Sequence, residues 1–228
     1  MEKILELYKN NHPIYDLTLN ENEELTIISF NDEIKDANLD LKINQKDNSV
    51  LNIYNIISTS TNALLKQIVN VEGRNCNTNI ISLFLSLDNA NINSYIEINH
   101  LNKESKSLLE TYVLSKDSSI VKLDNIGRIK NGCHKVSVRQ KAKGLTLSKE
   151  SHINASPILY IDDYDVEASH ACAIGSVNKE DLFYLMSRGL NEQEARKLIV
   201  LGFIMPIIDR INNDEITKEI NKSIIKKI

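Results

Sequence analysis

His170 and Cys172, in the stretch "ASHACAIGS", carry the clearest chemistry in this sequence. Neutral imidazole and thiolate both bind transition metals, and residues two apart on a strand point to the same side. The pair could therefore share one metal. The alternative is structural, because a histidine at a strand end often only forms a hydrogen bond and a free cysteine often serves as a small buried hydrophobe. Residue type and spacing leave both interpretations open.

Three other groups of candidate residues have simpler interpretations. Cys133 and His134 are adjacent, so on a strand they would face opposite sides and could not readily share a metal. Cys76 lies in the polar stretch "GRNCNTN" with no histidine or acid beside it, which predicts an incidental role. The acids of "DDYDVE" (162–167) lack the spacing of a calcium loop and predict a solvated turn. No phosphate-binding loop is present, so the chain itself should not hydrolyse ATP.

Composition narrows the class of protein and its partners. Three cysteines without a CxxC pair in 228 residues indicate a reducing compartment, and the mixed-charge beginning has no secretory pattern, so we expect a cytoplasmic protein. A net charge of −4 with interspersed signs argues against nucleic acid as a partner. The longest apolar run, Leu198 to Ile208, contains Gly202 and Pro206 and is too short to span a membrane, so no membrane partner is expected.

The elements that must position His170 and Cys172 are mostly strands. From about Leu25 to Gly175 apolar residues recur at every second position, which predicts a β-domain over 25–176 after a short helical or irregular segment, 1–24. The predicted segments are "LTIISF", "LKINQ", "VLNIYNII", "NIISLFLSL", "INSYIEINHL", "LLETYVLS", "HKVSVRQ", "LTLSKE" and "PILYIDD".

The segments between these strands are rich in Asn, Asp, Ser and Lys and too short for helices, which excludes a βαβ architecture. A sandwich, a barrel and a β-solenoid all remain. Asn at the segment ends favours the solenoid slightly, because Asn accepts left-handed backbone conformations and can form stacked ladders. The segment "IISLFLSL" would be an aggregation hazard at an edge, so we expect it at the centre of a sheet.

After Gly175 the apolar period changes to between three and four, which predicts a helical module over 177–228. Asn178 caps a first helix that Gly189 ends, and Asn191 caps a second with Glu194 at the capping-box position. Pro206 should kink this second helix or start another. A last helix, from about Asp214, carries an isoleucine at every fourth position: Ile216, Ile220, Ile224 and Ile228.

The second helix is apolar around more of its circumference than one core-facing stripe requires. Such a helix is covered either by neighbouring elements or by another protein. Both alternatives stand.

The stretch from Ser156 to Phe203 resembles the C-terminal signature of the SufB/SufD family of iron–sulfur cluster assembly scaffold proteins. The resemblance rests on a proline followed by an alternating strand, then "DVEASH", a nearby glycine, "EDLFYLMSRGL" and "EARKLIVLGF" in matching order. These features cover roughly 50 contiguous residues, which is more specific than a single short motif. Upstream of about Asp124 only a β pattern remains, and the chain is short for the family.

The resemblance implies a fold and partners. The family has a right-handed parallel β-helix core followed by C-terminal helices, which selects the solenoid. It implies a non-enzymatic subunit that docks a SufC-type ABC ATPase through its helices and pairs its β-helix with a SufB-type subunit or with itself. An iron–sulfur cluster would be held transiently at the subunit interface, and none stably by the isolated chain. A metal-free scaffold and, less favoured, a carbohydrate-active β-helix enzyme are the alternatives.

The resemblance also implies roles for residues. His170 matches the histidine of the family's "SHG" motif, and Ala171 replaces the usual glycine. Cys172 adds a thiolate, the preferred ligand of iron–sulfur clusters. The cysteine that SufB-type members carry on the preceding strand falls near Ala142, so the chain resembles SufD. The residues expected to bind a partner are Leu182, Phe183, Arg188, Phe203 and Met205.

Overall fold

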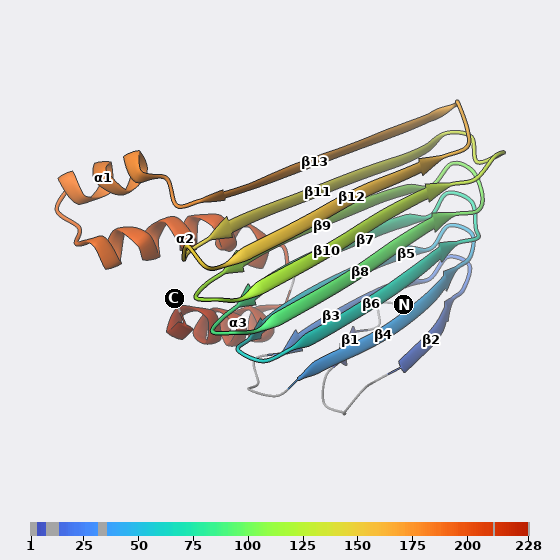
Figure 1. Cartoon of the computed structure of the whole chain (residues 1–228). Coiled ribbons are helices and arrows are strands. Elements are labelled where there is room, and N and C mark those ends of the chain that lie inside the picture. The colour runs from blue at the N-terminus through green and yellow to red at the C-terminus, as the bar shows by residue number, and fades with distance from the viewer. Residues whose placement is uncertain (1–3, 8–13, 32–35, 212, 228) are drawn as a thin grey trace.

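The computed structural model describes residues 4–7, 14–31, 36–211 and 213–227. These residues form a parallel β-solenoid followed by three helices, as the resemblance implied (Figure 1). Successive strands alternate between two sheets that face each other, and each strand pairs in parallel with the strand two further along the chain. None of the described helices has the length and apolar character needed to cross a membrane.

Alternating strands build the two layers. Sheet A consists of β1 (Ile4–Leu7), β3 (Glu24–Asn31), β5 (Val50–Thr59), β7 (Asn77–Ser86), β9 (Lys106–Ser115), β11 (Val136–Thr146) and β13 (Val166–Ser176). Sheet B consists of β2 (Ile14–Leu19), β4 (Ala37–Gln45), β6 (Ala63–Val71), β8 (Asn91–His100), β10 (Ile120–Ile129) and β12 (His152–Ile161). The segment "IISLFLSL" lies in β7 between β5 and β9, which confirms its predicted central position.

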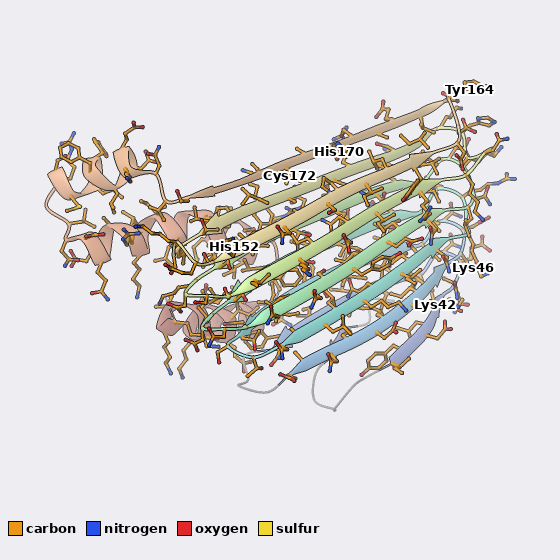
Figure 2. The ribbon with its side chains drawn as sticks, viewed as in Figure 1. Lys42, Lys46, His152, Tyr164, His170 and Cys172 are labelled. Atoms are coloured by element: carbon orange, nitrogen blue, oxygen red, sulfur yellow. The ribbon has the colours of Figure 1, made fainter. Side chains whose placement is uncertain are left out.

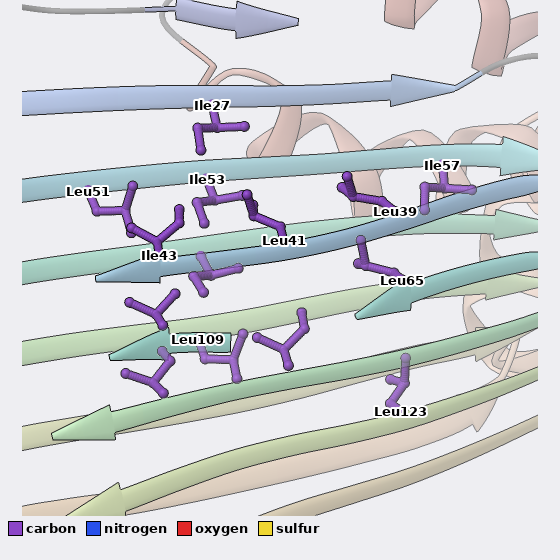
Figure 3. Packing of buried hydrophobic residues seen from close by; sticks show 14 of the residues in the cluster. Ile27, Leu39, Leu41, Ile43, Leu51, Ile53, Ile57, Leu65, Leu109 and Leu123 are labelled. Atoms are coloured by element: carbon purple, nitrogen blue, oxygen red, sulfur yellow. The ribbon is translucent and has the colours of Figure 1, made fainter. Parts of the chain in front are cut away.

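The space between the sheets holds the main hydrophobic core (Figure 3). Because parallel strands pair in register, residues at one inward position stack from coil to coil. The first inward column of sheet A contains Ile27, Ile53, Ile80, Leu109, Gln140 and His170. The second contains Ser29, Asn55, Ser82, Thr111, Ala142 and Cys172.

The second column forms a buried polar network in the middle coils. The side chains of Asn55 and Gln67 exchange two hydrogen bonds of 3.0 and 2.8 Å across the sheets, and Asn55 also donates to Ser82 at 3.0 Å. All three residues have no exposed surface. A paired buried network of this kind fixes the register of the coils, because any slip leaves several polar groups unpaired.

Asparagine supports the corners and the outer faces. Asn22, Asn48 and Asn75 have positive φ of 59°, 58° and 54° at successive turns, as the sequence predicted for corner residues. On the outside of sheet B, Asn70 donates to Asn44 at 2.9 Å, and Asn99 donates to Asn70 at 3.1 Å. The expected asparagine ladder is therefore present.

Three helices follow the solenoid: α1 (Lys179–Ser187), α2 (Glu192–Ile208) and α3 (Asp214–Lys227). Asn178 caps α1, Asn191 and Glu194 form the predicted capping box of α2, and Gly189 ends α1 with φ of 98°. Pro206 starts no new helix, since α2 continues through it to Ile208.

Helices α2 and α3 cover the outer face of sheet A. Val200, Ile204 and Ile220 join outward residues such as Ile56 and Leu83 in a second apolar cluster. Isoleucines 216 and 228 of the predicted last stripe lie outside the residues whose side chains are described. The solenoid thus covers the inner side of α2.

Some predicted boundaries were wrong. Residues 4–7 and 14–19 are strands of the two sheets, although segment 1–24 was expected to be helical or irregular. The "LTLSKE" segment (145–150) is the end of β11 and a turn rather than a separate strand. Strands β6 and β10 were not predicted; in "ALLKQIVNV" (63–71) inward Gln67 interrupts the apolar face.

Candidate metal and partner site at the open end of the solenoid

No described element covers the last coil of the solenoid. Among the described strands, β12 pairs only with β10 and β13 pairs only with β11, so each is an edge of its sheet (Figure 1). We call these two strands the open end. Their free edges expose unpaired backbone donors and acceptors over 10 and 11 residues.

His170 and Cys172 both lie on β13 at this open end (Figure 2). They pair in register with Gln140 and Ala142 of β11, whose side chains are buried between the sheets. In-register neighbours point the same way, so both side chains face the interior. No further coil covers them, and both remain exposed. The predicted shared direction of the two side chains is therefore present.

An apolar rim surrounds this pair. Val166 and Ala168, on the same side of β13, pack with Leu159 against the small core cluster below them. A β-carbon at Gly144 would lie 2.8 Å from the Ile153 side chain and 3.3 Å from that of Ile174, so the rim is closely packed there. The candidate ligands thus lie on a surface made partly of apolar side chains and partly of unpaired backbone groups.

The number of ligands limits what one chain can hold. Among the described residues, no group of three or more His, Cys, Asp or Glu side chains could bind a metal ion. His170 and Cys172 would provide at most two ligands, and Ala142 beside Cys172 provides none. A metal or cluster with four ligands would need the rest from another molecule.

Gln140 is a site residue that sequence reasoning missed. It lies one strand below His170, and its Nε2 donates to the carbonyl of Ile158 at 3.4 Å. Its Oε1 is buried without a hydrogen-bond partner among the described residues. The alternation of Val136 and Val138 in "HKVSVRQ" already placed Gln140 on the inward face, which was the available signal.

The other predicted candidates lie elsewhere. Cys133 is buried and donates from Sγ to the carbonyl of His100 at 3.3 Å, while half-exposed His134 lies with Nδ1 3.1 Å from Asp163 Oδ1. Burial raises the pKa of the Cys133 thiol. These placements agree with structural roles for both residues. Cys76 is buried at a corner of the solenoid, with Sγ 3.1 Å from the carbonyl of Lys46.

Asp163 corrects the solvated-turn expectation for "DDYDVE". The backbone N–H groups of Asp165 and Gly132 donate to its carboxylate at 3.0 and 2.8 Å, and its side chain is fully buried. The backbone hydrogen bond from Asp165 is the main reason that the pKa of Asp163 lies below its usual value. The hydrogen bonds from Gly132 and His134 lower this pKa further. The carboxylate ties two neighbouring corners together.

The residues expected to bind a partner divide into two groups. Phe183 is 75% exposed on α1, Arg188 is exposed after it, and Leu182 is half-buried. Phe203 instead packs edge-on against Tyr112 of β9 with ring centroids 5.8 Å apart. Met205 likewise packs against the cluster beneath α2.

Four exposed apolar side chains lie on the adjacent helices α1 and α2. Helix α1 has no buried residue and contacts α2 but not the sheets in any substantial way. We call these four residues, three on α1 and one on α2, the α1 face. They are Phe183, Tyr184, Met186 and Leu198, with exposures of 75, 56, 43 and 48%.

A parallel β-solenoid with an open end and terminal helices defines the structural class. Residues 10–203 match the sequence profile of the family described as the SufBD core domain of the SUF system for FeS cluster assembly. The chain therefore belongs to this family.

Curated relatives agree with that assignment. The iron–sulfur cluster assembly protein SufD of Bacillus subtilis is 34% identical over 132 residues, which are 58% of this chain and 30% of the relative. SufD of Plasmodium falciparum is 26% identical over 178 residues, or 76% and 12% of the two chains. SufD of Escherichia coli is 24% identical over 152 residues, or 66% and 36%. The chain thus spans between 12% and 36% of these relatives.

Proposed function

We propose that this chain is a non-enzymatic, SufD-like subunit of an iron–sulfur cluster assembly complex in the cytoplasm. Its open end pairs with a second β-solenoid, from a SufB-type subunit or another copy, and its helices bind a SufC-type ABC ATPase. His170 and Cys172 hold the nascent cluster transiently as cargo at the paired interface. The observation that carries the proposal is the exposure of both side chains on an unpaired strand edge.

The tendency of exposed sheet edges to pair with another chain supports pairing at the open end. Two long free strand edges beside an apolar rim are an aggregation hazard unless another chain covers them. Pairing would supply partners for the backbone groups and bury the rim. It would also bring further ligands to the two that this chain provides, which a four-ligand cluster requires.

The α1 face supports the proposal for the ATPase. Three of its four exposed side chains belong to α1, whose main packing partner is α2, so the fold itself does not need them. Arg188 lies 5.3 Å from the ring of Tyr184 and adds a positive charge at the rim of this face. We therefore assign partner binding to Leu182, Phe183 and Arg188.

Affinity capture tests the partners. The tagged chain is captured anaerobically from its native cytoplasm, and co-purifying proteins are identified by mass spectrometry. We expect an ABC ATPase, lost in Phe183→Asp and retained in the control Tyr164→Asp, which changes a 92% exposed tyrosine outside the helices. A point variant is preferable to truncation after Gly175, because truncation would uncover the sheet A face that α2 and α3 bury.

Reconstitution tests the ligands. The chain, with its pairing partner, receives iron and sulfide under anaerobic conditions, and visible absorbance reports the cluster. His170→Ala and Cys172→Ala should each reduce the absorbance, while outward Ser169→Ala should not. If neither ligand variant changes reconstitution or complementation of cluster assembly, the ligand assignment is wrong. Absence of any cluster, with partners present, would favour a metal-free scaffold.

A further inference from the structure

The first inward column of sheet A changes character near the open end. In four successive coils it contains Ile27, Ile53, Ile80 and Leu109, each at most 1% exposed. In the last two coils it contains Gln140 and then His170. A polar residue therefore enters this apolar column only directly beneath the candidate ligand.

The fold provides both space and a hydrogen-bond acceptor for the Gln140 side-chain amide. Its Nε2 donates to the carbonyl of Ile158 on β12. Gly127 of β10 leaves the space that the amide occupies, because a β-carbon there would lie 3.1 Å from Nε2 and equally close to Val138. Replacing Gly127 by any larger residue would displace the amide or its neighbours.

One end of this amide is left without a partner. Oε1 of Gln140 is buried and accepts no hydrogen bond from the described residues, which is costly for a polar atom. Of its two in-register neighbours, Leu109 has no side-chain donor, and His170 has an imidazole N–H. The His170 ring likewise has no hydrogen-bond partner in the described part of the chain, and it is exposed enough to turn.

We infer that Gln140 is a positioning residue for His170. Its side-chain carbonyl accepts the N–H of one ring nitrogen and leaves the lone pair of the other nitrogen facing the open end. Partners that fix the tautomer and orientation of a ligand histidine are a general feature of metal sites. The consequence for cluster binding rests on the proposed function; the hydrogen bond does not.

Nitrogen NMR of the full chain tests the hydrogen bond. The five histidines are labelled with ¹⁵N, and His170→Asn identifies the His170 signals. At mildly alkaline pH the ring shifts report which nitrogen carries the proton. We expect one tautomer in the native chain and in Gln140→Glu, which keeps an acceptor. Gln140→Leu should populate both tautomers; an unchanged distribution in this variant would overturn the inference.

Two further variants separate positioning from a general loosening of the core. Asn125→Leu removes another buried side-chain oxygen that has no hydrogen-bond partner among the described residues. Asn125 pairs in register with Pro157 rather than His170, so the tautomer should not change. A change equal to that of Gln140→Leu would contradict the inference. If Gln140→Leu does not fold, Gln140→Met offers similar length without an acceptor.

Metal binding distinguishes this inference from the proposed function. With the pairing partner present and Co²⁺ alone as probe, Gln140→Leu should weaken binding by about 10 to 100-fold, the usual effect of removing such a partner. Gln140→Glu should bind nearly as the native chain does. Suppose that neither His170→Asn nor Gln140→Leu changes the Co²⁺ affinity, while Gln140→Leu still changes the His170 tautomer. His170 is then not a ligand, but the hydrogen bond to Gln140 is supported.

Discussion

Leu109 and His170 occupy the same inward column of sheet A, two strands apart, and differ in what covers them. Leu109 is 1% exposed because coils lie on both sides of it. His170 points the same way at the open end, where no further coil follows. The same contrast separates Thr111, which is fully buried, from Cys172.

This comparison teaches that inward direction alone does not make a residue part of the core. In the middle coils, covering strands turn inward side chains into stabilising contacts. At the open end the same geometry presents them to solvent or to another chain. Changes in the middle should therefore alter stability, and changes at the end should alter binding.

The largest difference should come from removing apolar volume. Phe84 is fully buried in the main core, so Phe84→Ala should lower the free energy of unfolding by about 3–5 kcal/mol. Ile174, 42% exposed on β13, should cost less than about 1 kcal/mol when changed to alanine. Denaturant unfolding measures both. Equal losses would mean that the open end is packed like the middle.

Protonation of one buried inward histidine, His100, should destabilise the covered coils. Burial lowers the pKa of His100 to about 4, so the unfolded chain binds this proton more readily than the folded chain. Its stabilising contribution is present above pH 6.5, the ordinary pKa of histidine, and is lost as pH falls towards about 4. The difference amounts to about 3 kcal/mol. The dependence of unfolding on pH should become flatter in His100→Asn, because this variant lacks the buried ring.

The asparagine ladder should give a smaller effect. Asn70 accepts from Asn99 and donates to Asn44, so Asn70→Ala should cost about 1–2 kcal/mol. Asn154 lies on the outer face of β12, exposed and outside the ladder, and Asn154→Ala should change stability by less than about 0.5 kcal/mol. Thermal or denaturant unfolding measures the stability of both variants. A large loss for Asn154→Ala would show that the outer face of β12 already contributes to the fold.

Thiol labelling should reveal the contrast without changing stability. Cys76 and Cys133 are buried and Cys172 is exposed, so a thiol reagent should modify Cys172 first under native conditions. Cys172→Ser should abolish the fast reaction. Addition of the pairing subunit should slow it, since that subunit would cover β13. Fast labelling of Cys133 would contradict its burial in the folded chain.

Much of the fold could be predicted from the sequence. Period-two alternation located most strands, and capping residues located α1 and α2. The coil repeat was not visible because its length varies: Glu24 pairs with Val50, 26 residues later, whereas Ile120 pairs with His152, 32 residues later. Inward polar residues such as Gln67 also break the apolar pattern, and only the assembled interior gives them partners.

The candidate site was predictable in part. The shared direction of His170 and Cys172 follows from their spacing on a strand. Their exposure does not, because it depends on β13 being the last strand of its sheet. Phe203 and Met205 were expected on a partner surface, but they pack towards the solenoid. The sequence of a helix that is apolar on all sides does not show which side the solenoid covers.

The connection between β13 and α1 has a mechanical consequence. Strand β13 ends at Ser176 and α1 begins at Lys179, so only Val177 and Asn178 separate them, and Val177 is 9% exposed. Two extended residues span at most about 7 Å. Once these two residues are fully extended, a force that displaces α1 further would act through the backbone on β13, the strand that carries His170 and Cys172.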